Sequence, residues 1–177
     1  AFATQAHRII LDLFADPPPT FVKNLGDGHL LIWECPAQPD PARYMSAAAA
    51  LEAAGNPAAA KAAYAAAAGL WPKAPLPRIG LGNLAAAAGD WAAAELWYRA
   101  VLADDPAQAA ALNNRAEALV RLGCPDVARI LLQHGMVHVA ADDPLQPVLQ
   151  QTVRDLSTDV AATPAGVAAD CTQFTAR

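Results

Sequence analysis

Apolar residues recur at helical spacing along residues 41–157, and glycines interrupt them at a constant interval. Gly55, Gly89 and Gly123 are 34 residues apart (89 − 55 and 123 − 89). An alanine lies five residues after each glycine, and a large ring or aliphatic side chain follows four residues later. This period predicts three tandem helix–turn–helix units in a mainly α-helical fold. The units span 41–74, 75–108 and 109–142.

Small and large side chains alternate at matching points of the three units. Small residues are expected where two helices cross too closely for a large side chain, and large residues are expected to fill the space beside them. The small set is Ala48, Gly82, Ala116, Ala60, Ala94 and Ala128, and the large set is Tyr64, Tyr98 and Leu132.

The first 40 residues lie outside this repeat pattern and form a separate N-terminal segment, 1–40. Ile9–Phe14 reads as a short strand that a proline run ends, and His29–Cys35 reads as a second strand, followed by a proline-rich linker. Two strands alone are marginally stable in water. This hairpin-like segment is therefore expected to pack on the helices or to complete a sheet of another polypeptide.

The end of the chain predicts one further helix and a tail. Asp143 and Pro144 form a helix start, and residues 143–157 then carry apolar side chains at helical spacing. We expect a C-terminal capping helix whose apolar face consists of Val148, Thr152, Val153 and Leu156. Residues 158–177 show no periodicity and are expected to form a loose tail.

Composition and charge narrow the range of partners. Of the 177 residues, 55% are hydrophobic, so the chain can bury a core. Twelve basic and 17 acidic residues give a net charge of −5 without a basic run, so neither nucleic acid nor an anionic membrane is expected as a partner. No apolar run reaches the roughly 18 residues of a membrane span. The chain begins at Ala1 rather than Met, which indicates processing or a piece of a longer protein.

No catalytic, metal or cofactor site is expected. Cys35, Cys124 and Cys171 are too few and too scattered for a disulfide framework, their odd number leaves at least one unpaired, and none has a flanking motif that would activate it. His134 and His138 are four residues apart and could face one metal ion, but no third ligand follows at a set spacing. A solvated helix end is the simpler interpretation of the two histidines.

Residues 41–142 resemble the tetratricopeptide repeat family, which implies a stacked helical solenoid that binds other proteins. The departures from its usual pattern are Tyr44 and Arg78 in place of tryptophan, Arg115 in place of leucine, and Gly135 in place of alanine.

Residues 1–142 also resemble the C-terminal part of bacterial cysteine peptidases of the bacteriocin-processing (double-glycine) type that carry such repeats. Gly80-Leu81-Gly82-Asn83 and Ala111-Leu112-Asn113-Asn114 contribute to this resemblance. It implies that the catalytic residues lie outside this chain.

In solenoids of this kind the first helix of each unit lines the concave groove. Met45 and Ile79 would offer apolar contacts there, and asparagine side chains would pair with the backbone of an extended peptide. The alternative that the asparagines satisfy only helix ends and inter-repeat polar groups stays open. Trp71, Trp91 and Trp97 are expected to pack between units, or else to form a partner hot spot. The candidate groove residues are Met45, Glu52, Ile79, Asn83, Asn113, Asn114, Glu117 and Arg121.

The leading functional hypothesis is a non-enzymatic scaffold or accessory subunit that holds a protein segment in this groove, within a hetero-oligomeric assembly. One alternative is the repeat-containing part of a papain-like peptidase. Another is a structural subunit that docks by strand addition through residues 1–36. The lysine and arginine set by which some members of the repeat family grip a C-terminal carboxylate is absent from the expected groove. The peptidase resemblance implies a bacterial envelope location.

Overall fold

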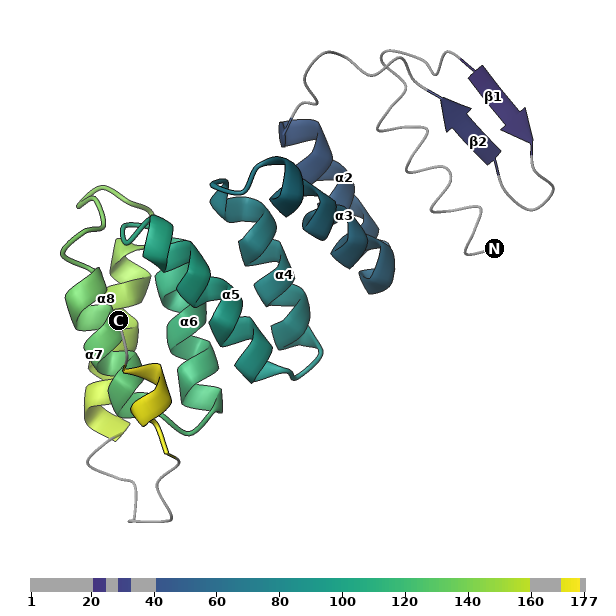
Figure 1. Ribbon diagram of the computed structural model, residues 1–177. Coiled ribbons are helices and arrows are strands. Elements are labelled where there is room, and N and C mark those ends of the chain that lie inside the picture. The colour runs from purple at the N-terminus through teal and green to yellow at the C-terminus, as the bar shows by residue number, and fades with distance from the viewer. Residues whose placement is uncertain (1–20, 25–28, 33–40, 160–169, 176–177) are drawn as a thin grey trace. The chain divides into compact units, whose positions relative to one another are not determined.

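The computed structural model describes residues 21–24, 29–32, 41–159 and 170–175. The chain divides into two compact units, Ala1–Pro77 and Arg78–Arg177, and Figure 1 shows their elements. Within the described part, no helix combines the length and the apolar character needed to cross a membrane.

The described part of the first unit begins with a two-stranded antiparallel sheet. Strand β1 is Phe21–Asn24 and strand β2 is His29–Ile32, with Phe21 opposite Ile32. The second strand thus begins at the predicted residue, and residues 33–35 of the expected strand lie outside the described residues. The expected strand Ile9–Phe14 lies outside the described residues, and the sequence pattern did not indicate β1.

Two helices complete the first predicted pair, α2 (Pro41–Ala53) and α3 (Pro57–Leu70). The Tyr64 hydroxyl of α3 donates to Glu52 Oε2 of α2 at 3.1 Å. At the other end of the pair, the rings of Tyr44 and Trp71 meet edge to face with centroids 5.6 Å apart. Tyr44 therefore fills the usual tryptophan position with an aromatic contact to Trp71.

The other two predicted pairs belong largely to the second unit, and the three-repeat prediction is confirmed. Helix α4 (Pro75–Ala87) starts in the first unit and pairs with α5 (Trp91–Asp104), while α6 (Ala109–Arg121) pairs with α7 (Pro125–Gly135). Helix α8 (Gln146–Asp159) follows, and a single 3₁₀ turn, η1 (Thr172–Phe174), is described near the C-terminus.

The three repeat glycines make the turns inside the pairs. Their φ angles are 73° at Gly55, 79° at Gly89 and 81° at Gly123, a region that other residues rarely adopt. After the first two turns, the side chains of Asn56 and Asp90 each accept a hydrogen bond from a backbone N–H of the following helix, at 3.1 and 3.0 Å. Cys124 occupies the same position in the third turn and makes no such cap.

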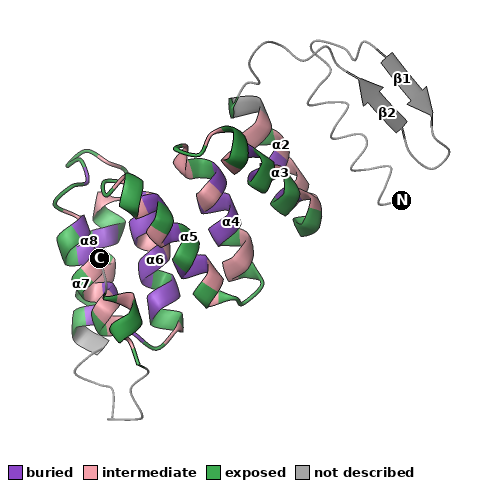
Figure 2. Cartoon of the chain, viewed as in Figure 1, coloured by how far each residue is buried: buried purple, intermediate pink, exposed green. Residues whose placement is uncertain are grey.

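Close approaches of neighbouring side chains explain two glycines of the second unit, Gly82 and Gly135. A Cβ added at Gly82 would collide with the ring of Tyr98, and a Cβ added at Gly135 would collide with the side chain of Leu112. Gly135, a departure from the repeat pattern, is thus a packing requirement set by Leu112. Figure 2 shows buried positions recurring along α4, α6 and α7.

Helix α8 packs on the core through Val153 and Leu156, as predicted, but Val148 and Thr152 do not belong to the packed face. Leu149 is fully buried and Leu156 is 7% exposed, whereas Val148 is 45% exposed. The Thr152 hydroxyl donates to the carbonyl of Val148 within its own helix. The packed side chains are those of Leu149, Val153 and Leu156 on α8 and of Leu145 just before it, so leucines take the places of the predicted Val148 and Thr152.

We predict that Gly82→Ala lowers the free energy of unfolding by about 1–3 kcal/mol, because the added methyl group forces the Tyr98 ring to move. Urea unfolding followed by circular dichroism measures the change. The control is Gly69→Ala on α3, where nothing lies within 4 Å of the added Cβ. It is expected to leave stability unchanged or to raise it by up to about 1 kcal/mol. Equal stability of the two variants would contradict the predicted collision.

Candidate functional site

A cavity of about 270 Å³ opens between α4, α5 and α6. We call it the amide pocket, because asparagine side chains from two neighbouring first helices meet in it. Its lining is Asn83, Ala86 and Ala87 from α4, Trp91 and Tyr98 from α5, and Asn114 and Glu117 from α6.

A chain of hydrogen bonds fixes the polar groups of the amide pocket. Asn83 Oδ1 accepts from the Tyr98 hydroxyl at 2.8 Å and from Asn114 Nδ2 at 3.0 Å. Asn113 Nδ2 in turn lies 3.4 Å from Asn114 Oδ1. Within the described part of the chain, no partner is recorded for Asn83 Nδ2. An exposed asparagine is thus oriented with its N–H groups available to an incoming carbonyl.

Tyr98 is the buried member of this network, and its hydroxyl donates to Asn83. Burial raises the pKa of Tyr98 to about 12, the negative charge of Glu117 acts in the same direction, and hydrogen bonding with the Asn114 side chain opposes them. The hydroxyl therefore stays protonated at neutral pH and remains a donor to Asn83.

Charged and aromatic groups form the rim of the amide pocket. Arg121 Nη2 lies 3.7 Å from Glu117 Oε1, one helical turn away, and both side chains are more than half exposed. The Arg121 guanidinium also lies 5.2 Å from the centroid of the Trp91 ring. An exposed ion pair of this kind is worth only about 0.2–1 kcal/mol, so both groups can change partners when a ligand arrives.

The structure brings together only part of the predicted groove set. Asn83, Asn114 and Glu117 line one pocket, Arg121 lies at its rim, and Asn113 is linked to it through Asn114. The prediction that Ile79 lines the groove is wrong. Ile79 is only 7% exposed and packs in the core with Ala94 and Tyr98. Met45 and Glu52 lie on α2 of the first unit, where Met45 is partly exposed and Glu52 accepts from Tyr64.

Sequence reasoning missed the role of Tyr98 in the pocket. The residue was assigned to packing alone, and its ring does pack on Gly82. Asn83 directly follows Gly82, so a tyrosine that packs against one can bond to the other. The sequence therefore contained a usable signal for this hydrogen bond: a tyrosine at the space-filling position of one helix and a Gly-Asn dipeptide at the crossing point of the other.

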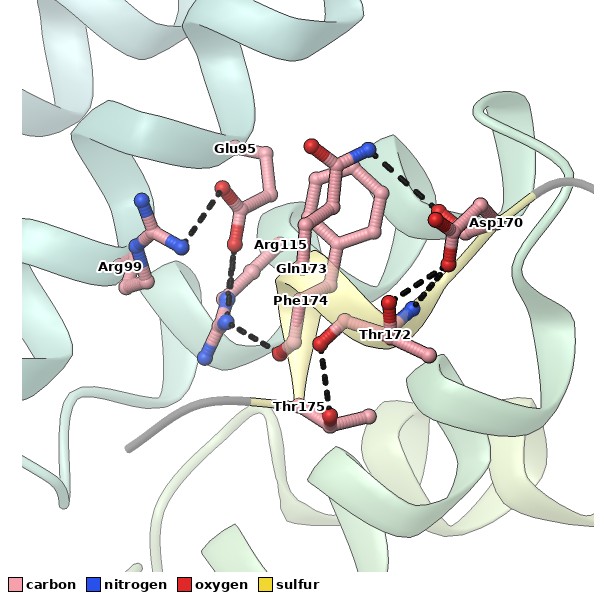
Figure 3. A network of polar contacts seen from close by, with 8 residues as sticks. All are labelled: Glu95, Arg99, Arg115, Asp170, Thr172, Gln173, Phe174 and Thr175. Atoms are coloured by element: carbon pink, nitrogen blue, oxygen red, sulfur yellow. Dashed lines mark hydrogen bonds and ion pairs between the residues drawn. The ribbon is translucent and has the colours of Figure 1, made fainter.

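A second polar network, which joins α5 and α6 to the C-terminal turn, was not indicated by the sequence pattern either. Glu95 is fully buried, and its Oε1 accepts from Arg115 Nε at 2.9 Å, while its Oε2 lies 3.8 Å from Arg99 Nη1. Arg115 Nη2 also donates to the carbonyl of Phe174 at 3.4 Å. Figure 3 shows this chain of contacts from α5 through α6 to the C-terminal turn. Desolvating two charges is costly, and the hydrogen bonds between Glu95 and Arg115 counter part of that cost, while Glu95 Oε2 accepts no hydrogen bond within the described residues.

Cys124 and Cys171 form a disulfide with a Cα–Cα distance of 5.8 Å. The sequence analysis predicted no disulfide framework, and this single bond corrects that expectation for Cys124 and Cys171. The expectation of a loose tail is also corrected over residues 170–175, because Cys171 and Phe174 pack against the core of the second unit. Cys35 lies outside the described residues.

A second cavity, of about 350 Å³, lies beside this anchored segment, and we call it the tail cleft. Apolar side chains dominate its lining, while Arg115, His134 and His138 add polar groups. Among the described residues no group of three or more His, Cys, Asp or Glu side chains could hold a metal ion. The lining is Leu102, Pro106, Leu112, Arg115, Val127, Ile130, Leu131, His134, Gly135, His138, Phe174 and Thr175.

Comparison with known proteins identifies the fold. No protein-family model matches the sequence, and no curated protein matches it either. Among solved structures, the first tetratricopeptide domain of Spaghetti (RPAP3), bound to an HSP90 peptide, superposes with a TM-score of 0.60 at 15% identity. That match covers 68% of this chain and 95% of the other.

Two further structures agree with it. The Yersinia enterocolitica secretion chaperone SycD, in complex with a peptide of the translocator YopD, has a TM-score of 0.60 at 17% identity, covering 67% of this chain and 93% of SycD. The Sgt2 tetratricopeptide domain from Aspergillus fumigatus has a TM-score of 0.59 at 14% identity, covering 73% and 87%. The fold is therefore a tetratricopeptide-type helical repeat. The resemblance to bacteriocin-processing peptidases stays a prediction.

We predict that the free energy of unfolding falls between pH 10 and about pH 12, because Tyr98 ionises less readily when folded. The raised pKa stabilises the fold fully below pH 10, and this contribution is lost as the pH rises through 12. Urea unfolding at several alkaline pH values measures the slope. Tyr98→Phe should make the slope shallower, although Tyr64, with a pKa also raised to about 12, retains its own contribution. An unchanged slope in Tyr98→Phe would show that Tyr98 ionises normally.

Proposed function

We propose that the amide pocket binds an extended segment of another protein, so that the chain acts as a non-enzymatic interaction module. The observation that carries the proposal is the meeting of Asn83 and Asn114, from successive first helices, above a buried tyrosine. A carboxamide can donate to a backbone carbonyl and accept from a backbone N–H, so such a pair suits an extended main chain.

The structural neighbours support the same class of function. Spaghetti was solved with an HSP90 peptide, and SycD with a peptide of YopD. These proteins are peptide-binding repeat domains and chaperones rather than enzymes. At 14–17% identity they support peptide binding in general and carry no information on the partner of this chain.

The charges around the pocket restrict the ligand chemistry. No lysine or arginine is among the side chains that line the amide pocket, and Arg121 at the rim is already near Glu117 and Trp91. A free C-terminal carboxylate would therefore meet no cluster of cations here. We propose an internal segment with small or apolar side chains, held mainly through its backbone.

The hairpin favours a second mode of association. In the two-stranded sheet formed by β1 and β2, each strand pairs with the other along one edge, and the described residues supply no partner for either outer edge. Such edges accept an added strand, so the chain can also serve as an accessory subunit in a larger assembly. Mass measurement of the complex from its native source tests this mode, and an isolated monomer would contradict it.

An oxidising compartment suits this chain. Disulfides persist in secreted, periplasmic and cell-surface proteins and are rare in reducing cytosol. The Cys124–Cys171 bond therefore supports our proposal of a bacterial envelope location, as the peptidase resemblance implies.

Asn114→Ala is expected to weaken peptide binding about tenfold, because it removes a pocket hydrogen bond worth about 1.4 kcal/mol. Peptides selected from a random library on the native protein serve as probes, and fluorescence anisotropy measures their affinities. Asn113→Ala is a graded comparison, because Asn113 does not line the pocket and contacts it only through a long hydrogen bond of 3.4 Å to Asn114. It is expected to change affinity by less than about threefold. Peptides that bind both variants equally well would place the binding site elsewhere.

A further inference from the structure

The segment Asp170–Thr175, which we call the C-terminal clip, is attached to the second unit in three ways. The Cys124–Cys171 disulfide ties it to the start of α7. The side chain of Phe174 packs against the core cluster of the second unit, to which Leu112 and Leu132 belong. The carbonyl of Phe174 accepts from Arg115 Nη2 at 3.4 Å.

The surface under the clip is formed without the clip's help. Glu95 binds Arg115 through both Nε and Nη2, at 2.9 and 2.8 Å, and fixes the guanidinium at the cleft. Leu112, Leu131 and the other aliphatic side chains of α5, α6 and α7 complete an apolar wall. An apolar hollow with one oriented cation suits an aromatic side chain whose own carbonyl reaches the cation.

Without the disulfide, the packing of Phe174 and the hydrogen bond of 3.4 Å from Arg115 would have to hold the clip. Its only regular structure is the single turn η1, in which the N–H groups of Phe174 and Thr175 donate to carbonyls within the clip. The hydroxyl and N–H of Thr172 both donate to the Asp170 carboxylate, again within the clip. A single turn does not persist in water by itself, so the disulfide determines whether the clip stays in place.

We propose that the tail cleft is a second docking site, for a protein segment that presents an aromatic side chain and a backbone carbonyl to Arg115. The chain's own clip occupies part of this site while the disulfide is intact. The seated Phe174 shows the chemistry that the site accepts, and the remaining cleft of about 350 Å³ leaves room for a longer ligand. None of the residues that line the amide pocket lines the tail cleft.

Reduction by a dithiol opens the site. The reductant's thiolate attacks the sulfur of Cys171, which is partly exposed, whereas Cys124 is 2% exposed. The S–S bond breaks, Cys124 leaves as a thiolate and takes up a proton, and a mixed disulfide forms on Cys171. The second thiol of the reductant displaces Cys171, which also becomes a thiol. Two electrons and two protons pass to the protein, and the dithiol becomes a cyclic disulfide.

The first experiment measures release of the clip by hydrogen exchange and mass spectrometry. A Cys35→Ser background removes the third cysteine, and the oxidised protein is compared with the same protein in dithiothreitol. The amides of Phe174 and Thr175 are expected to exchange about tenfold faster, or more, after reduction, because the covalent tether is lost. Equal exchange in both states would overturn the role of the disulfide.

The second experiment measures docking in trans. The probe is a synthetic peptide Asp-Ser-Thr-Gln-Phe-Thr, and its control has alanine in place of phenylalanine. Cys171→Ser with Phe174→Ala, in the Cys35→Ser background, opens the cleft without a reductant. Circular dichroism checks that this variant remains folded. NMR amide shifts are expected to change around Leu112, Leu131 and Arg115 with the phenylalanine peptide only, and not in the oxidised Cys35→Ser protein.

Each outcome decides the proposal. Absence of shifts in the folded open variant overturns the docking site, and equal shifts in the oxidised protein overturn the closure. Asn114→Ala added to the open variant is expected to leave the shifts in place, because Asn114 belongs to the amide pocket. Loss of the shifts in that variant would mean that the peptide binds the amide pocket instead, which overturns the assignment to the tail cleft.

Discussion

The contact between Tyr98 and Gly82 ties the packing of the second unit to its candidate site. The ring occupies the space that a side chain at residue 82 would need, so α5 approaches α4 closely. The same approach brings the hydroxyl to Asn83, the next residue on α4, and through Asn83 to Asn114 on α6. One buried side chain thereby sets both the helix crossing and the orientation of the amides. The pocket is rigid where it meets the core and adjustable at the Glu117–Arg121 rim.

Local sequence rules predicted most of the helical fold. A glycine with positive φ is the cheapest way to reverse the chain, so Gly55, Gly89 and Gly123 located the three turns. The crossing points also followed, since a residue with no side chain or a small one must lie where a ring packs. The face of α8 was harder to predict, because Val148 and Leu149 are adjacent and only the neighbouring core determines which one is buried.

Contacts between distant residues escaped the sequence pattern. Cys124 occupies the position at which Asn56 and Asp90 cap their helices in the other two repeats. The sequence shows this difference, but it does not show the disulfide partner, which is 47 residues away. Arg115 was recognised as an unusual replacement for leucine. Its meaning depends on Glu95, 20 residues earlier, and on Phe174, 59 residues later. Local propensity contains no information about such pairs. The repeat pattern correctly indicated that Asn83 and Asn114 lie on the pocket side of their helices. It could not show that tertiary packing buries Ile79 in the core.

Helix α6 separates the two cavities. Asn114 and Glu117 face the amide pocket, while Leu112 and Arg115 face the tail cleft. The two residues of each pair are three positions apart, so they lie on one face of the helix. Asn114 follows Leu112 by two positions, as Glu117 follows Arg115, and two positions correspond to a rotation of about 200° in a helix of 3.6 residues per turn. The cavities therefore lie on opposite sides of one buried helix, so a segment in one does not obstruct a segment in the other. Arg115 stands where the repeat family usually has leucine, and its buried charge requires Glu95 as a partner. Its guanidinium gives the side of α6 that faces the tail cleft a polar group. On our two proposals, the two surfaces would serve separate partners on one short repeat array.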